Sequence, residues 1–234
     1  MMQGMAQARD GQERFEVERR TVTVRTAGAG GPAVYLQVFM GDGQEVWGRL
    51  HAAAASPLTL VTVGNLNWDD DMSPWECPPL TRDDVPCAGK ADQHLARLLD
   101  DIVPRAEAVL PAPPAYRALA GYSLAGLFAV CALFQTDCFA RVASASGSLW
   151  FPGFVEYARQ HAFAGKPACC YLSLGRKEHK TPNRLLRSVR DNTQAFDDIL
   201  EQRGVPHVFE LNPGNHYQDG DVRMARGISW MLAQ

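Results

Sequence analysis

The chain has 234 residues and a mass of 25.7 kDa, with 46% hydrophobic and 21% charged residues. This composition excludes an intrinsically disordered or collagen-like chain and is typical of a folded globular protein. The net charge of −3 argues against a nucleic-acid partner. The main group of basic residues, between 176 and 190, has the spacing of a solvated helix face and gives no support for one either. We therefore expect a single domain over residues 1–234.

The expected cellular compartment of the protein follows from its apolar stretches, its N-terminal segment and its cysteines. No stretch approaches the ~20 apolar residues that span a bilayer, and the polar segment Met1–Arg14 lacks the apolar core of a signal peptide. We expect a cytoplasmic protein with no membrane partner and with residues 1–13 flexible. None of the six cysteines forms a C-x-x-C pair, so we expect reduced, packed thiols, with a Cys77–Cys87 disulfide as the alternative. The oligomeric state does not follow from the sequence.

The first third of the chain has the pattern of strands. Strands are expected at 16–25, 34–40 and 45–50, with a turn at 41–43. The apolar run Leu58–Val63 predicts a strand that is buried on both faces. A long loop follows over 65–90, and a loop of this length is often functional. A helix is expected over 91–110, with Pro104 as a kink or break.

Strands and helices alternate in the rest of the chain. Strands are expected at 116–122, 141–145, 168–174 and 206–211, and helices at 124–134, 154–163, 183–203 and 221–232. Such alternation predicts an α/β fold with a mostly parallel central sheet, antiparallel strands at the N-terminal side and helices on both faces.

The most informative motif is a G-x-S-x-x-G segment that reads Gly121-Tyr122-Ser123-Leu124-Ala125-Gly126. It lies between an expected strand and an expected apolar helix, which is the setting of a nucleophile elbow. Ala125 replaces the second glycine of the usual G-x-S-x-G, a mild change because the turn needs only a small residue there. The alternative is an ordinary strand–helix turn with a capping serine.

A serine hydroxyl needs a base, and His216 is the best candidate. It lies in the loop Asn212–Tyr217 after the last expected strand, where an α/β hydrolase carries its catalytic histidine. The acid should follow the preceding strand, and Glu178 is the only carboxylate in the loop 175–179. Its role would be to orient the imidazole. The alternatives are a surface ion pair for Glu178, with Asp219 or Asp221 as the acid.

Three segments together resemble the Putative esterase family of α/β hydrolases, in its enterochelin-esterase-like and esterase-D-like branch. They are Gly121–Phe128, Ser146–Trp150 and Pro213–His216, and the likeness runs from about Leu58 to the C-terminus. The resemblance implies Ser123 as nucleophile, His216 as base and the loop of Glu178 as the source of the acid. Some siderophore esterases of this branch are described as using a Ser–His dyad.

The oxyanion hole and the substrate pocket are expected around the same loops. The chain lacks an H-G-G-G motif, so the oxyanion donors would be the backbone N–H of Leu124 and one near Asn65 or Leu66. Ligands bind at the carboxyl ends of strands in open α/β sheets. Four aromatic residues on such loops are therefore expected to contact substrate, although each could serve in packing: Trp68, Trp75, Trp150 and Phe151. The acidic run Asp69–Asp71 lacks calcium-loop spacing, so a solvated loop or a cap for the following segment is expected and no metal site.

These observations predict a serine hydrolase that cleaves a small-molecule carboxylic ester through an acyl-enzyme. Its mechanism needs neither cofactor nor metal. One alternative is an acyltransferase that uses the same site with an alcohol or sugar as acceptor. The other is a non-catalytic binding protein on the hydrolase fold, for which loss of at least one of Ser123, His216 or the acid would be expected.

Overall fold

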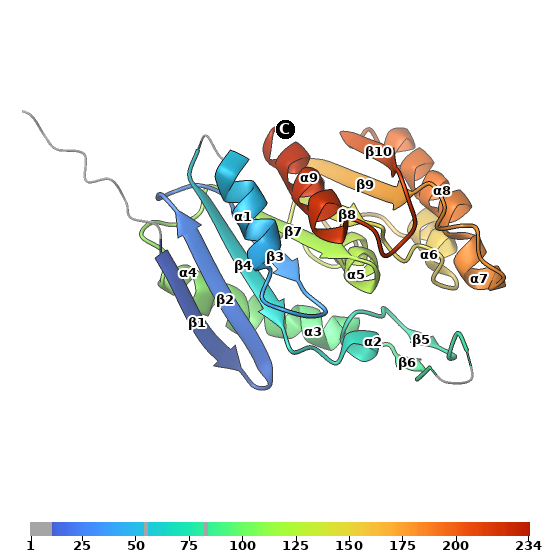
Figure 1. The fold of residues 1–234 in the computed structure, drawn as a ribbon, viewed down its shortest axis with the longest axis horizontal. Helices are drawn as coiled ribbons and strands as arrows, with labels where there is room; N and C mark the ends of the chain where they lie inside the picture. Colours follow the sequence, from blue (N-terminus) through green and yellow to red (C-terminus); the bar gives the residue numbers. More distant parts are fainter. Residues whose placement is uncertain (1–10, 54–55, 82–83) are drawn as a thin grey trace, which may run out of the picture.

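The computed structural model describes residues 11–53, 56–81 and 84–234. In these residues a mixed sheet has the strand order β1-β2-β4-β3-β7-β8-β9-β10 (Figure 1). Its strands are β1 (Gly11–Val17), β2 (Arg20–Ala27), β3 (Ala33–Gln37), β4 (Leu58–Gly64), β7 (Arg117–Tyr122), β8 (Arg141–Ala145), β9 (Cys169–Gly175) and β10 (His207–Asn212). All neighbouring pairs from β4 to β10 are parallel, whereas β1–β2 and β2–β4 are antiparallel. The predicted fold class is confirmed.

Helices cover both faces of the sheet. On one face, α1 (Gln44–Ala53) lies beside α9 (Gly220–Leu232), and both pack over the inner strands (Figure 1). The other face is covered by α3 (Ala91–Arg97), η1 (Leu98–Ile102), α4 (Val103–Ala108), α5 (Leu124–Ala132), α6 (Phe154–Gln160) and α8 (Val189–Gln202). Because both faces are covered, every residue of β4 is buried, as the continuous apolar run predicted.

One of the expected N-terminal strands is wrong, and another is interrupted by a turn. The expected strand at 45–50 lies within helix α1, whose Val46 and Leu50 are four residues apart and are both buried against the sheet. A run this short fits either period, and its packing against α9 decides for the helix. The expected strand at 16–25 is a hairpin of β1 and β2, which reverses at Glu18 with a positive φ of 53°.

The long loop and the two longest expected helices contain more structure than their patterns indicate. The loop 65–90 holds α2 (Trp68–Asp71) and the short pair β5 (Glu76–Cys77) and β6 (Cys87–Ala88). Between α3 and α4 the π-helical turn η1 precedes Pro104, which sits in the first turn of α4, where its missing N–H costs little. The expected helix 183–203 is divided at Ser188 into α7 (Arg184–Arg187) and α8.

The cysteines and the N-terminal segment complete the fold. All six cysteines are free, and Cys77 and Cys87 face each other across the β5–β6 pair. Burial raises the pKa of Cys87 to about 11. Residues 11–13 of the segment expected to be flexible form the start of β1, and residues 1–10 lie outside the described residues. No helix in the described part of the chain has the length and apolar character needed to cross a membrane.

Candidate active site

Ser123 occupies a sharp turn between β7 and α5. Its φ of 60° and ψ of −124° lie outside the regions that residues with side chains usually adopt, as expected for a strained elbow that exposes a nucleophile. The turn is tight enough to require Gly121, because a Cβ at that position would lie 2.2 Å from the carbonyl oxygen of Ala125. The methyl group of Ala125 is accommodated in the same turn, so the departure from G-x-S-x-G does not disturb the elbow.

His216 lies between Ser123 and Glu178. Its Nε2 is 3.1 Å from Ser123 Oγ, and its Nδ1 is 2.9 Å from Glu178 Oε2. The three side chains come from the carboxyl ends of β7, β9 and β10, which run parallel in one sheet. Because the carboxyl ends of parallel strands share one edge, residues 93 positions apart in the sequence meet there.

The hydrogen bonds of Glu178 and His216 indicate which of their atoms carry protons. Burial by itself would raise the pKa of Glu178, but hydrogen bonds from His216, from the Gly175 N–H and from Ser146 Oγ together lower its pKa below the ordinary value. Glu178 is therefore an ionised carboxylate, which only accepts hydrogen bonds. The His216 proton then lies on Nδ1, and Nε2 keeps a lone pair that can accept the proton of Ser123.

The structure distinguishes Glu178 from the other candidate acids. Asp221 pairs with Arg49 of α1 at 2.6 Å. Asp219 caps the start of α9 and bonds through its carbonyl oxygen to the N–H of Arg223. Within the described ranges, neither aspartate forms a side-chain hydrogen bond or ion pair with His216, whereas Glu178 does.

A cavity of about 440 Å³ opens beside this row of residues. Its volume falls in the range of about 300–1,000 Å³ that is usual for small-molecule sites. Its lining includes Ser123, Leu124, Ser148, Glu178 and His216. Ser148 Oγ lies 3.4 Å from Ser123 Oγ, so the Ser123 hydroxyl has a hydroxyl neighbour at the cavity wall in addition to His216.

The four aromatic residues expected at the substrate divide into two pairs. Trp68 and Trp150 line the cavity. Trp75 and Phe151 are not among its lining residues, because Trp75 donates through its indole N–H to the carbonyl oxygen of Pro152 and packs edge-on against a fully buried Phe151. They support Trp150 from behind, since the rings of Phe151 and Trp150 are 5.7 Å apart.

The expected oxyanion donors also differ in position. Leu124 lines the cavity and is the first residue of α5, where backbone N–H groups have no partner inside the helix. Asn65 and Leu66 are not among the lining residues; Asn65 donates through Nδ2 to the carbonyl oxygen of Arg19, and Leu66 packs on the core. The wall on that side is formed instead by Trp68 and Asp69.

The acidic run is not a solvated loop throughout. Asp71 is buried and pairs with Arg19 and Arg20, and Asp70 pairs with Lys90. Asp69 is the member that lines the cavity, and its pKa is raised by burial and by its acidic neighbours. No group of three metal-ligating side chains occurs in the described part of the chain.

Three residues to which the sequence patterns assigned no role hold the site together. Tyr122 bonds to the backbone of His216, Ser146 donates to Glu178, and Arg223 contacts both Glu178 and Ser146. Arg223 had a detectable signal, because it is a charged residue on the apolar stripe of α9, and charged side chains are rarely buried unless paired.

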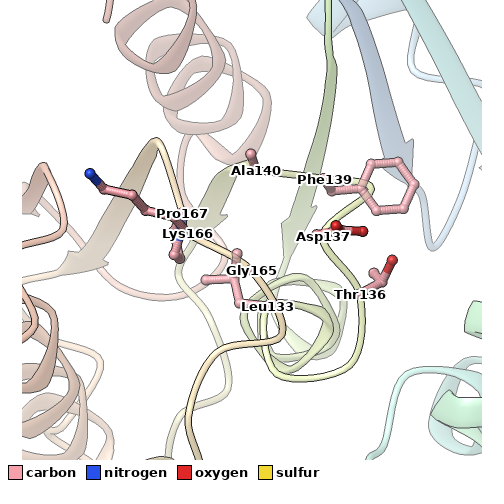
Figure 2. A pocket seen from close by; sticks show the side chains of 8 residues that line it. All are labelled: Leu133, Thr136, Asp137, Phe139, Ala140, Gly165, Lys166 and Pro167. Carbon is pink, nitrogen blue, oxygen red and sulfur yellow. The ribbon is translucent and has the colours of Figure 1, made fainter.

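A second, small cavity lies at the other end of the strands, next to the amino-terminal ends of β8 and β9. Figure 2 shows its side chains where the end of α5 meets the loops that precede β8 and β9, among them Phe139, Gly165 and Lys166. Its volume of about 10 Å³ could hold a water molecule at most, so it is no alternative substrate site.

Comparisons with known proteins agree with this architecture. The sequence model of the Putative esterase family matches residues 17–216. A relative, the uncharacterized protein YbbA of Bacillus subtilis (strain 168), is 22% identical over 221 residues, which make up 89% of this chain and 88% of the relative. The crystal structure of an IroE-like serine hydrolase from Shewanella oneidensis is similar with a TM-score of 0.77 at 18% identity, covering 96% of this chain and 80% of the other. The siderophore hydrolase EstA from Aspergillus nidulans is similar with a TM-score of 0.72 at 19% identity, covering 100% and 97%.

Proposed function

We propose that this chain, which belongs to the Putative esterase family, is a serine ester hydrolase in which Ser123, His216 and Glu178 act as nucleophile, base and acid. The observation that carries the proposal is the position of His216, with Nε2 at 3.1 Å from Ser123 Oγ and Nδ1 at 2.9 Å from Glu178 Oε2. Both distances lie within the reach that proton transfer requires.

In the proposed acylation step, Ser123 Oγ attacks the ester carbonyl carbon and its proton passes to His216 Nε2. The electron pair of the carbonyl π bond moves to the oxygen, which the Leu124 N–H at the start of α5 stabilises together with the positive end of that helix. When the tetrahedral intermediate collapses, the alcohol leaves with the proton from His216. Glu178 stabilises the imidazolium ion that exists between these two transfers.

In the proposed deacylation step, water takes the place of the alcohol. His216 Nε2 removes a proton from the water, the oxygen bonds to the acyl carbon, and the acid product leaves as Ser123 regains its proton. The His216 side chain remains 30% exposed, so solvent can reach it. We accordingly propose hydrolysis, with a small-molecule ester as substrate. The share of acyl transfer is measured as the ester formed when an alcohol is added.

The second oxyanion donor and the location of the protein remain predictions. We propose a backbone N–H from the segment after β4, where Asn65 and Leu66 are the sequence candidates and Trp68 forms the nearest cavity wall. We also propose a cytoplasmic protein. Apart from the ester and water, the reaction as written uses only side chains and backbone groups of this chain.

Labelling with a fluorophosphonate tests the proposed nucleophile. We expect one adduct by intact mass, mapped to the peptide that holds Ser123, and its loss in Ser123→Ala and His216→Ala. Ser229→Ala, which removes an exposed hydroxyl on α9, is the matched control and should label like the wild type. An adduct on another residue would contradict Ser123 as the nucleophile. No adduct under conditions that label a reference hydrolase would contradict the proposal and favour a non-catalytic binding protein.

A further inference from the structure

Arg223 is a buried cation in the first turns of α9. Its side chain is 2% exposed, and burial of a charge is costly unless it is paired. Its Nε has no hydrogen-bond partner among the residues that the structure describes, so the burial is only partly compensated. An incompletely satisfied buried charge calls for a reason other than stability. Its position within the site supplies one.

The other two nitrogens of Arg223 bond to four different segments of the site. Nη1 lies 3.3 Å from Tyr122 Oη, 3.1 Å from Ser146 Oγ and 3.2 Å from Glu178 Oε1. Nη2 donates to the carbonyl oxygen of Pro213 at 2.7 Å. These partners follow or end β7, β8, β9 and β10, so one guanidinium joins the loops at which the proposed catalytic side chains are placed.

On the side of the acid, Arg223 helps to decide which oxygen of Glu178 faces the base. Oε1 accepts from Ser146 Oγ at 2.8 Å and from the Gly175 N–H at 2.5 Å, in addition to Arg223. Oε2 is left for His216 Nδ1. Since a carboxylate is planar, saturating one oxygen also sets the direction of the other.

On the side of the base, Arg223 holds the loop that carries His216. Its bond to Pro213 secures the loop three residues before His216. Its bond to Tyr122 leaves the tyrosine hydroxyl proton free to donate to the carbonyl oxygen of His216, at 2.7 Å. The acid and the base are therefore positioned by the same side chain.

We propose that Arg223 is a positioning residue for the ester hydrolysis, acting through Glu178 and the loop of His216. It does not line the cavity and would not touch the substrate. This inference rests on the proposed function of the three catalytic side chains. The role requires arginine, because its planar fork carries separate nitrogens to Glu178 and Pro213, whereas the single ammonium of a lysine cannot reach both in that geometry.

Steady-state kinetics on Arg223→Gln, with a soluble nitrophenyl ester, tests the proposal. We expect kcat to fall about 10²-fold, the usual effect of a misplacement near 1 Å, and KM to stay within about threefold because Arg223 is not among the residues that line the cavity. Arg223→Lys should fall between this variant and the wild type. Arg226→Gln is the matched control, since Arg226 lies on the same helix, is exposed and bonds to Asn212 instead.

A double-mutant cycle separates positioning from a general effect on the fold. If Arg223 acts through Glu178, then Arg223→Gln should cost at least tenfold less in the Glu178→Gln background than in the wild type. The same cycle is made with Arg223→Lys if Arg223→Gln does not fold. The proposal is overturned by an unchanged kcat, or by equal losses in the two backgrounds.

Failure of the proposed function would be seen separately. It would show as full activity in Ser123→Ala or Glu178→Gln, whatever the Arg223 variants do. If those variants lose activity and Arg223→Gln does not, the catalytic assignment stands and only the role of Arg223 is rejected.

Discussion

Tyr122 Oη donates a hydrogen bond to the carbonyl oxygen of His216 at 2.7 Å. The residue immediately before the proposed nucleophile therefore holds the backbone of the proposed base. The two rings are also in contact, with centroids 5.4 Å apart. This contact links the end of β7 with the loop after β10, two strands that are not neighbours in the sheet. The separation of Ser123 and His216 is thus maintained by a direct tie between their segments.

Replacement of Glu178, the proposed acid, by its amide should abolish most of the activity. Glu178→Gln keeps the size of the side chain but places an amide opposite His216 Nδ1, which favours the wrong tautomer of the imidazole. We expect kcat to fall about 10⁴-fold, the scale seen for the corresponding change in other Ser–His–acid enzymes. The control is Asp221→Asn, whose carboxylate pairs with Arg49. Equal activity of the two variants would rule out Glu178 as the acid.

The elbow should tolerate no side chain at Gly121. In Gly121→Ala the added Cβ would lie 2.2 Å from the carbonyl oxygen of Ala125, so the turn must open or the protein must unfold. We expect a loss of several kcal/mol in unfolding free energy, on the scale of overpacking in a core, or no soluble protein. Gly48→Ala is the matched control. Its Cβ would meet nothing within 4 Å inside helix α1, so a gain of up to about 1 kcal/mol is expected. Thermal melts compare the two, and similar melting temperatures would contradict the reasoning.

Stability should depend on pH through His94. This residue is fully buried, accepts from Arg20 Nε at Nδ1 and bonds through Nε2 to Gln37 Oε1. Burial, followed by the charge of Arg20, lowers its pKa to about 3. The unfolded chain binds the proton near pH 6.5, so the stabilisation is complete above that pH and is lost as the pH falls toward 3. At pH 4.5 the loss amounts to roughly 2–3 kcal/mol.

Urea titrations from pH 7.5 to 4.5 measure this dependence. The wild type should lose more stability than His94→Gln over that range, so the difference between the two proteins shrinks as the pH falls. His161→Gln, at an exposed position, is the control. Parallel curves for the wild type and His94→Gln would show that His94 is not the source of the pH dependence.

Trp150 should influence which esters are cleaved. It lines the cavity, whereas Trp47 belongs to α1 and stacks on His51. In Trp150→Ala we expect kcat/KM for an aromatic ester to fall at least tenfold relative to an acetyl ester, within the range of about 10–200-fold that one apolar contact supplies. Two ester series are compared, one varying the acyl group and one the alcohol. Trp47→Ala should leave both series unchanged, and an unchanged ratio in Trp150→Ala would remove it from the substrate contacts.

Local patterns predicted the elements that carry a clear period. The alternation of strand and helix from 116 onward is confirmed, with the expected helix 183–203 divided at Ser188, because repeated strand–helix units reinforce one another as a pattern. The six residues at 45–50 belong to no such repeated unit, and they form a helix because Val46 and Leu50 meet the apolar layer below α9. The turn at Glu18 was missed because its positive φ occurs in a residue with no turn preference.

The sequence by itself determined the α/β class and the elbow at Ser123, because a strained turn between a strand and a helix depends on neighbouring residues alone. It also placed His216 and Glu178 on loops after successive strands. Only the tertiary structure decided that Glu178 and not Asp219 or Asp221 meets His216, that Trp68 and Trp150 line the cavity while Trp75 and Phe151 pack behind it, and that Arg223 joins the loops. These relations depend on distances between the ends of different strands, which the register of the sheet sets and no local pattern encodes.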